Sequence, residues 1–390
     1  MGGGFLGRVK RAMQEKEEQR RYFALAPEER PVTVYAEDDY TWNQLEGYVV
    51  RLAREHGRHV AYVTSQSDDP LRIAPPDGVR VFYVDDLVPQ FLPTVDSPVF
   101  VTTMPDLGAL HVKRPATPAV VYLFHSLNST HVAYREGAFD AYDVLGVTGP
   151  YQKPELEARY AAIGKTGYEL AEVGYYKLDR IAEGARGHEP AHPTETTVLV
   201  APSWGEYNLL ASCGEELVGS LAAQGFRTVV RPHPAFFESL YPEGRAIVDA
   251  LQRRFAGDAR VVFETSITSE DSFYEAALMI SDWSGAAFEY AFGTERPVLF
   301  VDVERKVRNP GWKEFGIVPF EERLRSEVGA VLEAGWAARA GDAASSLVER
   351  AGEHADRIRD ARDREIYNFG SAAEAGAAMI DGLIARRSPR

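Results

Sequence analysis

The regular alternation of short apolar runs with helical stretches is the feature that most constrains how this chain can fold. The runs are rich in β-branched and aromatic residues, which is typical of strands buried on both faces of a parallel sheet. We therefore expect strands at residues 32–35, 59–64, 79–84, 98–102, 119–124, 144–147, 197–200, 227–230, 260–263, 277–281 and 295–301. Helical patterns lie at residues 42–56, 153–163, 215–224, 246–255, 285–293, 321–338, 343–362 and 372–385. The predicted fold class is α/β.

A segment without periodicity, Arg180–Thr194, interrupts the alternation and is rich in Gly, Glu, His and Pro, as linkers are. It predicts two doubly wound, Rossmann-like domains that face each other across a cleft, followed by C-terminal helices. The expected division is an N-terminal arm (1–30), a first α/β domain (31–183), a linker (184–195), a second α/β domain (196–370) and a helix with a basic tail (371–390). Ligands of open parallel sheets bind beyond the carboxyl ends of the strands, so polar residues there are the candidate site.

Charge and cysteine content narrow the functional classes. A net charge of -15 at pH 7 disfavours a nucleic-acid-binding protein. The one cysteine, Cys213, cannot form an intramolecular disulfide, which favours a reducing compartment. No apolar run approaches the roughly 20 residues of a membrane span, and no signal-peptide pattern opens the sequence. We expect a cytoplasmic protein.

The N-terminal arm leaves two interpretations open. One face of a helix at residues 5–22 is apolar and is flanked by basic side chains, namely Phe5, Leu6, Val9 and Met13 beside Arg8, Lys10 and Arg11. A basic amphipathic helix suits an anionic surface, so peripheral contact with the inner face of the cell membrane is one expectation. The other is an arm that packs on the protein or frays, which is the commoner fate of such a short segment.

A polar turn between two buried strands is the first candidate site. Asp282, Ser284 and Gly285 lie where the helix at residues 285–293 begins, and we expect that helix to stop at Gly293. Unpaired backbone N–H groups and the positive end of the helix dipole suit an anion such as phosphate. The alternative is that Asp282 and Ser284 only cap the helix.

Two histidines follow the strand that ends at Phe124. His125 comes directly after the strand, where a side chain that titrates near neutral pH can act as a general base. The alternative for each is a histidine satisfied by hydrogen bonds within the loop. We favour the functional interpretation for His125 and the structural one for His131.

Two further strand ends carry polar residues. The strand at residues 227–230 runs into Arg231 and His233, and the prolines at 232 and 234 stiffen the backbone that presents them. The planar guanidinium of Arg231 suits phosphate oxygens. The strand at residues 197–200 is followed by Ser203 and Trp204, which could line the cleft, although core packing is the commoner fate of a tryptophan.

Several standard sites are missing from the sequence. It has no CxxC pair and no closely spaced set of His and carboxylate residues, so no metal is predicted. It also has no GxGxxG after the first strand and no GxxxxGK[ST], which argues against a standard dinucleotide or P-loop site. The residues alone indicate a two-domain α/β enzyme acting on a phosphorylated, nucleotide-linked substrate, and they do not name the group transferred.

Ordered blocks of sequence resemble the CDP-glycerol glycerophosphotransferases, the teichoic-acid primases and polymerases. The resemblance spans residues 119–385, and the order and spacing of the blocks carry it, because each block alone is unspecific. The blocks are Tyr122–Ser126, Gly174–Asp179, Ala201–Trp204, Arg231–Pro234 and Ile280–Gly285 continuing to Phe288–Tyr290, with a weaker match at Asn368–Ala372.

The resemblance implies a GT-B-type fold and transfer of a glycerol-phosphate unit from CDP-glycerol, or a related CDP-alcohol, to an acceptor hydroxyl of an envelope polymer or lipid-linked acceptor. It implies no cofactor and no metal. The first domain would then hold the acceptor and the second the CDP donor. His125 and His233 would be catalytic. The donor phosphates and nucleotide would meet Arg231, Asp282, Ser284, Gly285, Glu289, Ser203 and Trp204.

The chain departs from the family pattern at two positions. The family's His-Gly is His125-Ser126 here, on the side that would shape the acceptor. The family's Asp-Tyr-Ser-Ser is Asp282-Trp283-Ser284-Gly285 here. Gly285 lacks the hydroxyl that would contact the donor and keeps only its N–H. Another CDP-alcohol, or another phosphate-linked polymer such as a capsule, therefore stays open. So do two other functions, a sugar transferase or epimerase that uses a UDP-sugar, and a non-catalytic envelope-assembly protein with a decayed site.

Overall fold

The computed structural model describes residues 5–38, 40–109, 112–237, 241–265 and 269–387. The strands of this part of the chain are β1 (Val32–Ala36), β2 (Val60–Thr64), β3 (Val79–Tyr83), β4 (Val99–Thr102), β5 (Ala119–Leu123), β6 (Val144–Val147), β7 (Glu169–Glu172), β8 (Thr197–Val200), β9 (Arg227–Val230), β10 (Val261–Phe263), β11 (Leu278–Ser281), β12 (Val298–Asp302) and β13 (Gly329–Glu333).

Its α-helices are α1 (Phe5–Phe23), α2 (Trp42–Arg54), α3 (Val88–Phe91), α4 (Thr130–Ala133), α5 (Gln152–Ala162), α6 (Tyr176–Gly187), α7 (Leu209–Ala223), α8 (Gly244–Phe255), α9 (Asp271–Glu275), α10 (Gly285–Thr294), α11 (Phe320–Val328), α12 (Ala340–Glu349), α13 (Ala351–Glu365) and α14 (Ala372–Arg387). No helix among the described residues combines the length and the apolar character that crossing a bilayer requires.

The chain divides into two compact units. The first comprises Met1–His125, Tyr134–Lys177 and Ile366–Arg390, and the second comprises Ser126–Ala133 and Leu178–Glu365. The units differ from the expected domains in three places. The second unit resumes at Leu178, before the expected linker. A short segment after β5 groups with the second unit, and the C-terminal segment returns to the first, because α14 packs against α2 and β4.

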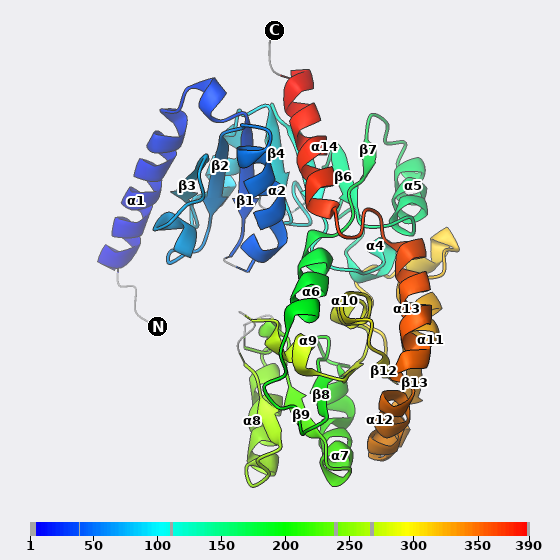
Figure 1. The fold of residues 1–390 in the computed structure, drawn as a ribbon. Coiled ribbons are helices and arrows are strands. Elements are labelled where there is room, and N and C mark those ends of the chain that lie inside the picture. Colours follow the sequence, from blue (N-terminus) through cyan, green and yellow to red (C-terminus); the bar gives the residue numbers. More distant parts are fainter. Residues whose placement is uncertain (1–4, 39, 110–111, 238–240, 266–268, 388–390) are drawn as a thin grey trace. The chain divides into compact units, whose positions relative to one another are not determined.

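The first unit is built on a parallel sheet with the strand order β3-β2-β1-β4-β5-β6-β7 among the described residues. The central strands that the apolar runs predict are buried, as in Val32–Ala36 and Ala119–Leu123, whereas the edge strand β3 exposes Arg80. In Figure 1, α14 lies beside α2. Side chains from α14, such as Ile380 and Ile384, belong to the same core as Val121. Burial on both faces explains why these runs lack the alternation of a half-exposed strand.

The N-terminal helix α1 packs on the first unit along β3. Tyr22 is fully buried, and its hydroxyl lies 2.8 Å from the hydroxyl of Thr33. The carboxylate of Glu15 accepts hydrogen bonds from the backbone N–H groups of Asp85 and Leu87, at 3.0 and 2.9 Å. The C-terminal half of α1 is thus a packing arm. Contact of the arm with a membrane remains a prediction.

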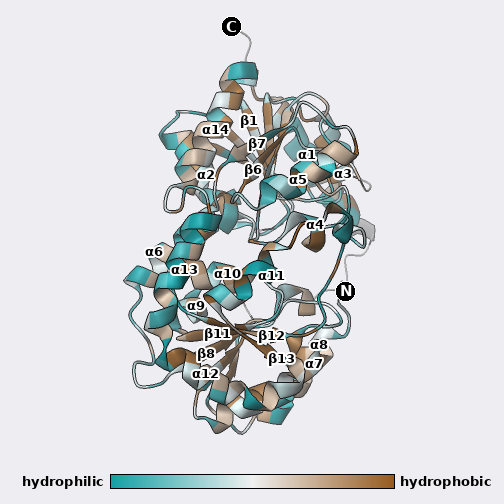
Figure 2. Cartoon of the chain, turned by 90° about the vertical axis from the view of Figure 1, so that its right-hand side faces the viewer, coloured by the Kyte–Doolittle hydropathy of each residue, from teal (hydrophilic) through white to brown (hydrophobic). Residues whose placement is uncertain are grey.

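The second unit has a parallel sheet in the order β10-β9-β8-β11-β12-β13 over the residues described. The strand order reverses between β8 and β11, which are neighbours in the sheet although β9 and β10 lie between them in the sequence. Figure 2 shows these apolar strands in brown, with the more polar α13 in teal. A ligand site of an open parallel sheet is expected at such a reversal.

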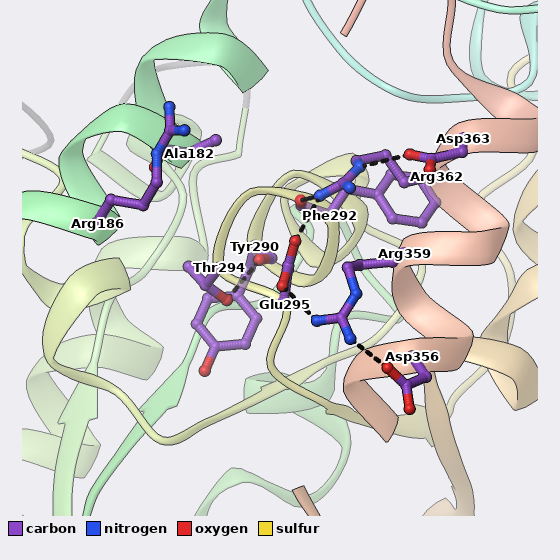
Figure 3. Close-up of polar contacts among 10 residues, drawn as sticks. All are labelled: Ala182, Arg186, Tyr290, Phe292, Thr294, Glu295, Asp356, Arg359, Arg362 and Asp363. Carbon is purple, nitrogen blue, oxygen red and sulfur yellow. Dashed lines mark hydrogen bonds and ion pairs between the residues drawn. The ribbon is translucent and has the colours of Figure 1, made fainter. Parts of the chain in front are cut away.

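Helix α10 runs one residue beyond the expected stop at Gly293, to Thr294, and Glu295 is its C-cap. Glu295 is left-handed with φ 58°, a conformation that costs a non-glycine residue energy. Its carboxylate accepts hydrogen bonds from Arg359 at 2.8 Å and from Arg362 at 2.9 Å, both on α13 (Figure 3). The ion pairs that dock α13 therefore fix the end of α10, and the sequence signal at Gly293 was misleading.

Three local predictions are wrong. The expected linker begins inside α6, which extends to Gly187. The expected helix at residues 321–338 ends at Val328 and is followed by strand β13. Strand β7 was not expected at all. Both missed strands lie at sheet edges and carry helix-forming residues such as Ala, Leu and Glu, so pairing with a neighbour decides their conformation.

Gly174 joins β7 to α6 in a conformation that only glycine adopts easily. Its φ is +88°, and a Cβ would overlap the backbone oxygen of Tyr367, in the segment that leads to α14. We expect Gly174→Ala to destabilise the protein by about 3 kcal/mol or more, from the clash and the strained backbone together. Chemical denaturation monitored by circular dichroism measures this.

Gly167→Ala is the matched control. Gly167 also has a positive φ of +73°, but a Cβ there would meet nothing within 4 Å. Its free energy of unfolding should fall by only about 1 kcal/mol, which is the cost of the left-handed backbone. Equal losses in the two variants would contradict the packing of the C-terminal segment on Gly174.

Candidate functional site

The carboxylate of Asp282 lies at the reversal between β8 and β11 and is fully buried. Its Oδ1 accepts a hydrogen bond from the backbone N–H of Ser203 at 2.7 Å, and its Oδ2 accepts one from Leu209 at 3.0 Å. Burial raises the pKa of Asp282, and the two backbone N–H groups oppose this rise. Asp282 thus ties the loop after β8 to the end of β11. Its direct contact with a donor remains a prediction.

Ser284 and Gly285 begin helix α10. Ser284 is the N-cap, with an extended backbone and a side chain that accepts a hydrogen bond from Ala286 N–H at 3.3 Å. The capping interpretation of Ser284 is therefore correct, although a cap at this position leaves other first-turn N–H groups to a ligand. Gly285 and Glu289 are buried. The donor contacts expected of all three stay predictions.

Trp204 brings the loop after β8 together with His233 from the loop after β9. The two rings lie 6.1 Å apart, centroid to centroid, and are inclined by 33°. Trp204 is partly buried and also packs against the core of the second unit. Trp204 therefore does both things that the sequence left open: one part of its ring packs in the core, and the ring also contacts a candidate site residue.

Lys306, in the loop after β12, is a site residue that the sequence reasoning missed. Its ammonium nitrogen lies 2.8 Å from the centroid of the Trp204 ring. Burial, followed by the charge of Arg308, lowers the pKa of Lys306 to about 7, and Asp282 partly opposes this. The signal was a pair of basic residues, Arg305 and Lys306, in the loop that follows a buried strand. The rule applied to the loops after β8 and β9 holds for the loop after β12 as well.

A stacked tryptophan holds the loop that carries Lys306. The indole N–H of Trp283 donates a hydrogen bond to Val303 O at 2.9 Å. The guanidinium carbons of Arg305 and Arg325 lie 4.0 and 3.7 Å from the centroid of the Trp283 ring. Cation–π contacts and the hydrogen bond together fix the loop against the turn that contains Asp282.

Arg231 has the contacts of a structural arginine. It is 8% exposed, and its guanidinium donates to Ser272 Oγ and Ser269 O, both at 2.8 Å. It also lies over the ring of Phe273, and Glu264 is 3.7 Å away. These partners account for its position without a ligand. Its role at the donor phosphates stays a prediction.

The ring of His233 is oriented to donate a hydrogen bond. Its Nδ1 lies 3.1 Å from the backbone nitrogen of Ala235, which can only donate, so Nδ1 is the acceptor. The proton of the neutral ring is therefore on Nε2. An imidazole Nε2–H suits a phosphate oxygen, and it cannot accept a proton at that nitrogen.

The ring of His125, in the first unit, has the opposite orientation. Its Nδ1 lies 3.0 Å from the carbonyl oxygen of Thr103, which can only accept, and 3.1 Å from the hydroxyl of Tyr122, which can accept or donate. A proton on Nδ1 satisfies both contacts. The lone pair is then on Nε2, as a general base requires. The hydroxyl of Tyr175 donates to His125 O at 2.8 Å and holds the backbone. The geometry thus permits the predicted role of His125.

His131 is buried in the second unit, as expected for a structural histidine. Its Nε2 lies 3.2 Å from Ile317 O, and its ring packs against Trp312 and Phe315. Among the predicted site residues of the second unit, a hydrogen bond connects Ser203 with Asp282, and a ring contact connects Trp204 with His233. Across the described ranges, no group of three or more His, Cys, Asp or Glu residues is arranged to hold a metal ion.

Comparison with known proteins supports the fold rather than a family. No family model matches the chain, and no curated protein matches it. A structure of the wall teichoic acid polymerase TagF with CDPG has a TM-score of 0.57 and 14% identity, covering 98% of this chain and 96% of its own. A putative UDP-N-acetylglucosamine 2-epimerase from Listeria monocytogenes has a TM-score of 0.56 and 14% identity, covering 88% and 93%.

A third solved structure extends the same likeness to a different donor chemistry. The α,α-trehalose-phosphate synthase (UDP-forming) from Burkholderia vietnamiensis has a TM-score of 0.54 and 12% identity, and the match covers 92% of this chain and 99% of that one. At these identities the likeness shows the fold alone. With two parallel-sheet α/β units and these neighbours, the chain has the GT-B fold that was predicted.

Proposed function

We propose that this chain transfers a glycerol-phosphate, or related polyol-phosphate, unit from a CDP-alcohol to an acceptor hydroxyl during synthesis of a cell-envelope polymer. The observation that carries the proposal is the set of motif blocks at strand ends, which is supported by the cluster of Trp204, His233 and Lys306. The GT-B fold shared with TagF agrees with it. The acceptor is an envelope polymer or a lipid-linked molecule.

In the proposed reaction the acceptor oxygen attacks the phosphorus that bears the polyol. An oxygen–phosphorus bond forms, the bond between the two phosphates breaks, and CMP leaves. The proton of the acceptor hydroxyl passes to Nε2 of His125. Negative charge that develops on the CMP phosphate needs donors and cations, which His233 Nε2–H and Lys306 supply. No step of this scheme needs a cofactor or a metal ion.

Release of CMP tests the proposal directly. Purified protein should release CMP from CDP-glycerol or CDP-ribitol when a panel of polyol-phosphate and lipid-linked acceptors is present. We expect His125→Ala to lower kcat by about 100-fold or more, as loss of a general base does. His233→Ala should lower kcat as well, because the leaving phosphate loses a hydrogen-bond donor.

His192→Ala is the control for both variants, since His192 is exposed and lies outside this site. It should retain the activity of the wild type. Full activity in His125→Ala would exclude the proposed base. No CMP from either donor with any acceptor would show that the substrate assignment is wrong.

A UDP-sugar transferase or epimerase is the second candidate function. The observation in its favour is the nearly equal TM-score of the putative UDP-N-acetylglucosamine 2-epimerase, at 0.56 against 0.57 for TagF. Thermal-shift titration with CDP, UDP and GDP separates the candidates, because each base presents different hydrogen-bonding edges. A stronger shift with UDP than with CDP would favour the second candidate, and no shift with any nucleotide would favour a non-catalytic protein.

The pKa of Lys306 makes nucleotide binding depend on pH. Below about pH 7 Lys306 is protonated and can pair with a diphosphate, and above it the amine is neutral in the free protein. Binding then requires proton uptake, so the Kd for CDP should rise as the pH increases from 7 to 9. Isothermal titration calorimetry across that range measures the Kd and the protons taken up.

Two variants isolate this effect. Lys306→Met should weaken CDP binding at pH 7 by about tenfold or more, since hydrogen bonds to charged groups contribute about 1.5–3 kcal/mol. It should also flatten the pH dependence. Lys306→Arg stays charged throughout the range, so it should flatten the dependence while retaining tight binding. A wild-type pH profile in Lys306→Met would rule out the role of Lys306.

A further inference from the structure

The chain passes from the first unit to the second directly after the candidate base. His125 is the last residue of its segment in the first unit, and Ser126–Ala133 groups with the second unit before the chain returns at Tyr134. His125 is therefore joined by one peptide bond to a segment whose surroundings are set by the second unit. What holds Ser126–Ala133 in place also limits where His125 can lie.

A buried carboxylate anchors the middle of this segment. Glu321, at the start of α11, accepts hydrogen bonds from Ser129 N–H at 2.8 Å and from Ser129 Oγ at 2.7 Å. Phe320 N–H donates to the same Oγ at 2.7 Å. Ser129 is fully buried and Glu321 is 6% exposed. Breaking such a buried, charge-assisted set is costly, so the anchor is rigid.

The segment is also fixed at its end. Arg308 N–H donates to Val132 O at 3.0 Å, and the side-chain amide of Asn309 donates to His131 O at 3.1 Å. Both partners follow β12, in the loop that also carries Lys306. The anchor at Ser129 and these two bonds fix the middle and the end of the segment. Its beginning, next to His125, instead contacts the start of α10.

At that beginning, Ser126 fits against Gly285, the first residue of α10. A Cβ on Gly285 would overlap Ser126 Oγ and would lie 2.9 Å from Asn128 Oδ1 and 3.1 Å from Asn128 Nδ2. The Asn128 amide donates to Ser126 Oγ at 2.8 Å, so the two polar side chains form one layer over the glycine. Gly285 is not in the left-handed region, and the close approach rather than its conformation requires glycine.

We propose that Ser126 and Gly285 form a size-matched pair through which the start of α10 positions His125. The hydroxyl that is absent at position 285 is replaced in space by the hydroxyl of Ser126, which approaches from the loop after β5. The two departures from the family pattern are then one compensated change. The positioning role rests on the proposed function, whereas the fit of the pair does not.

A double-mutant cycle tests the pair. Gly285→Ala should lower the melting temperature and reduce kcat by about 10- to 100-fold, because a displacement of about 1 Å can cost that much. The KM for the donor should change less than kcat. Ser126→Gly removes the nearest atom that the new methyl group meets, and it frees the Asn128 side chain from its hydrogen bond to Ser126 Oγ, so that the amide can move aside. Ser126→Gly combined with Gly285→Ala should therefore recover the stability and turnover of Ser126→Gly alone.

The control for the added methyl group is Gly219→Ala in α7, where a Cβ would meet nothing within 4 Å. It should leave the melting temperature and kcat near the wild-type values. A double variant no better than Gly285→Ala would overturn the pair. Recovery of stability without recovery of turnover would overturn the positioning of His125.

Failure of the proposed function is distinguishable from failure of this inference. If the wild type turns over no CDP-alcohol, the ring C–H resonances of His125 in NMR spectra, assigned with His125→Gln, report its surroundings. They should shift in Gly285→Ala and return in the double variant. Unchanged His125 resonances in Gly285→Ala would overturn the positioning role whatever the substrate is.

Discussion

The buried carboxylate of Asp282 is the interaction on which the second unit's candidate site depends. A carboxylate without solvent needs hydrogen-bond donors, and two backbone N–H groups supply them, one from Ser203 in the loop after β8 and one from Leu209 at the start of α7. These hydrogen bonds hold the loop after β8 at the end of β11. The position of that loop sets the position of Trp204, against which Lys306 packs. The aspartate thus positions the loop that carries the candidate site residues, although both of its oxygens accept hydrogen bonds from the backbone.

Backbone geometry determines the chemistry of the two histidines. A carbonyl oxygen faces Nδ1 of His125, and a backbone N–H faces Nδ1 of His233. These contacts make one ring an acceptor at Nε2 and the other a donor, so the same residue type serves as base on one unit and as phosphate ligand on the other in the proposed reaction. Their tautomers separate the two proposed roles.

The fold and much of the site could be predicted from the sequence because buried parallel strands leave a strong apolar pattern. The pattern failed at β7 and β13, where edge strands contain helix-forming residues and pairing decides. Ser203, Trp204, His233 and Asp282 were found because they directly follow strands. Lys306 obeys the same rule and was overlooked. The fit of Ser126 on Gly285 joins residues far apart in sequence, and the hydrogen-bond partners of Arg231 lie in and just before α9, so neither could be inferred without the fold.

The return of the C-terminal segment to the first unit has a consequence for biosynthesis. Helix α14 supplies core side chains such as Ile380 and Ile384 to a sheet whose strands were all translated before residue 173. The first unit therefore cannot complete its core until α14 has been translated, and by then all strands and helices of the second unit have been made. Domains usually fold as they emerge, N-terminal first, but here a helix translated after the whole second unit must close the first core. Synthesis of α14, rather than synthesis of the first half, sets when the unit bearing His125 becomes stable.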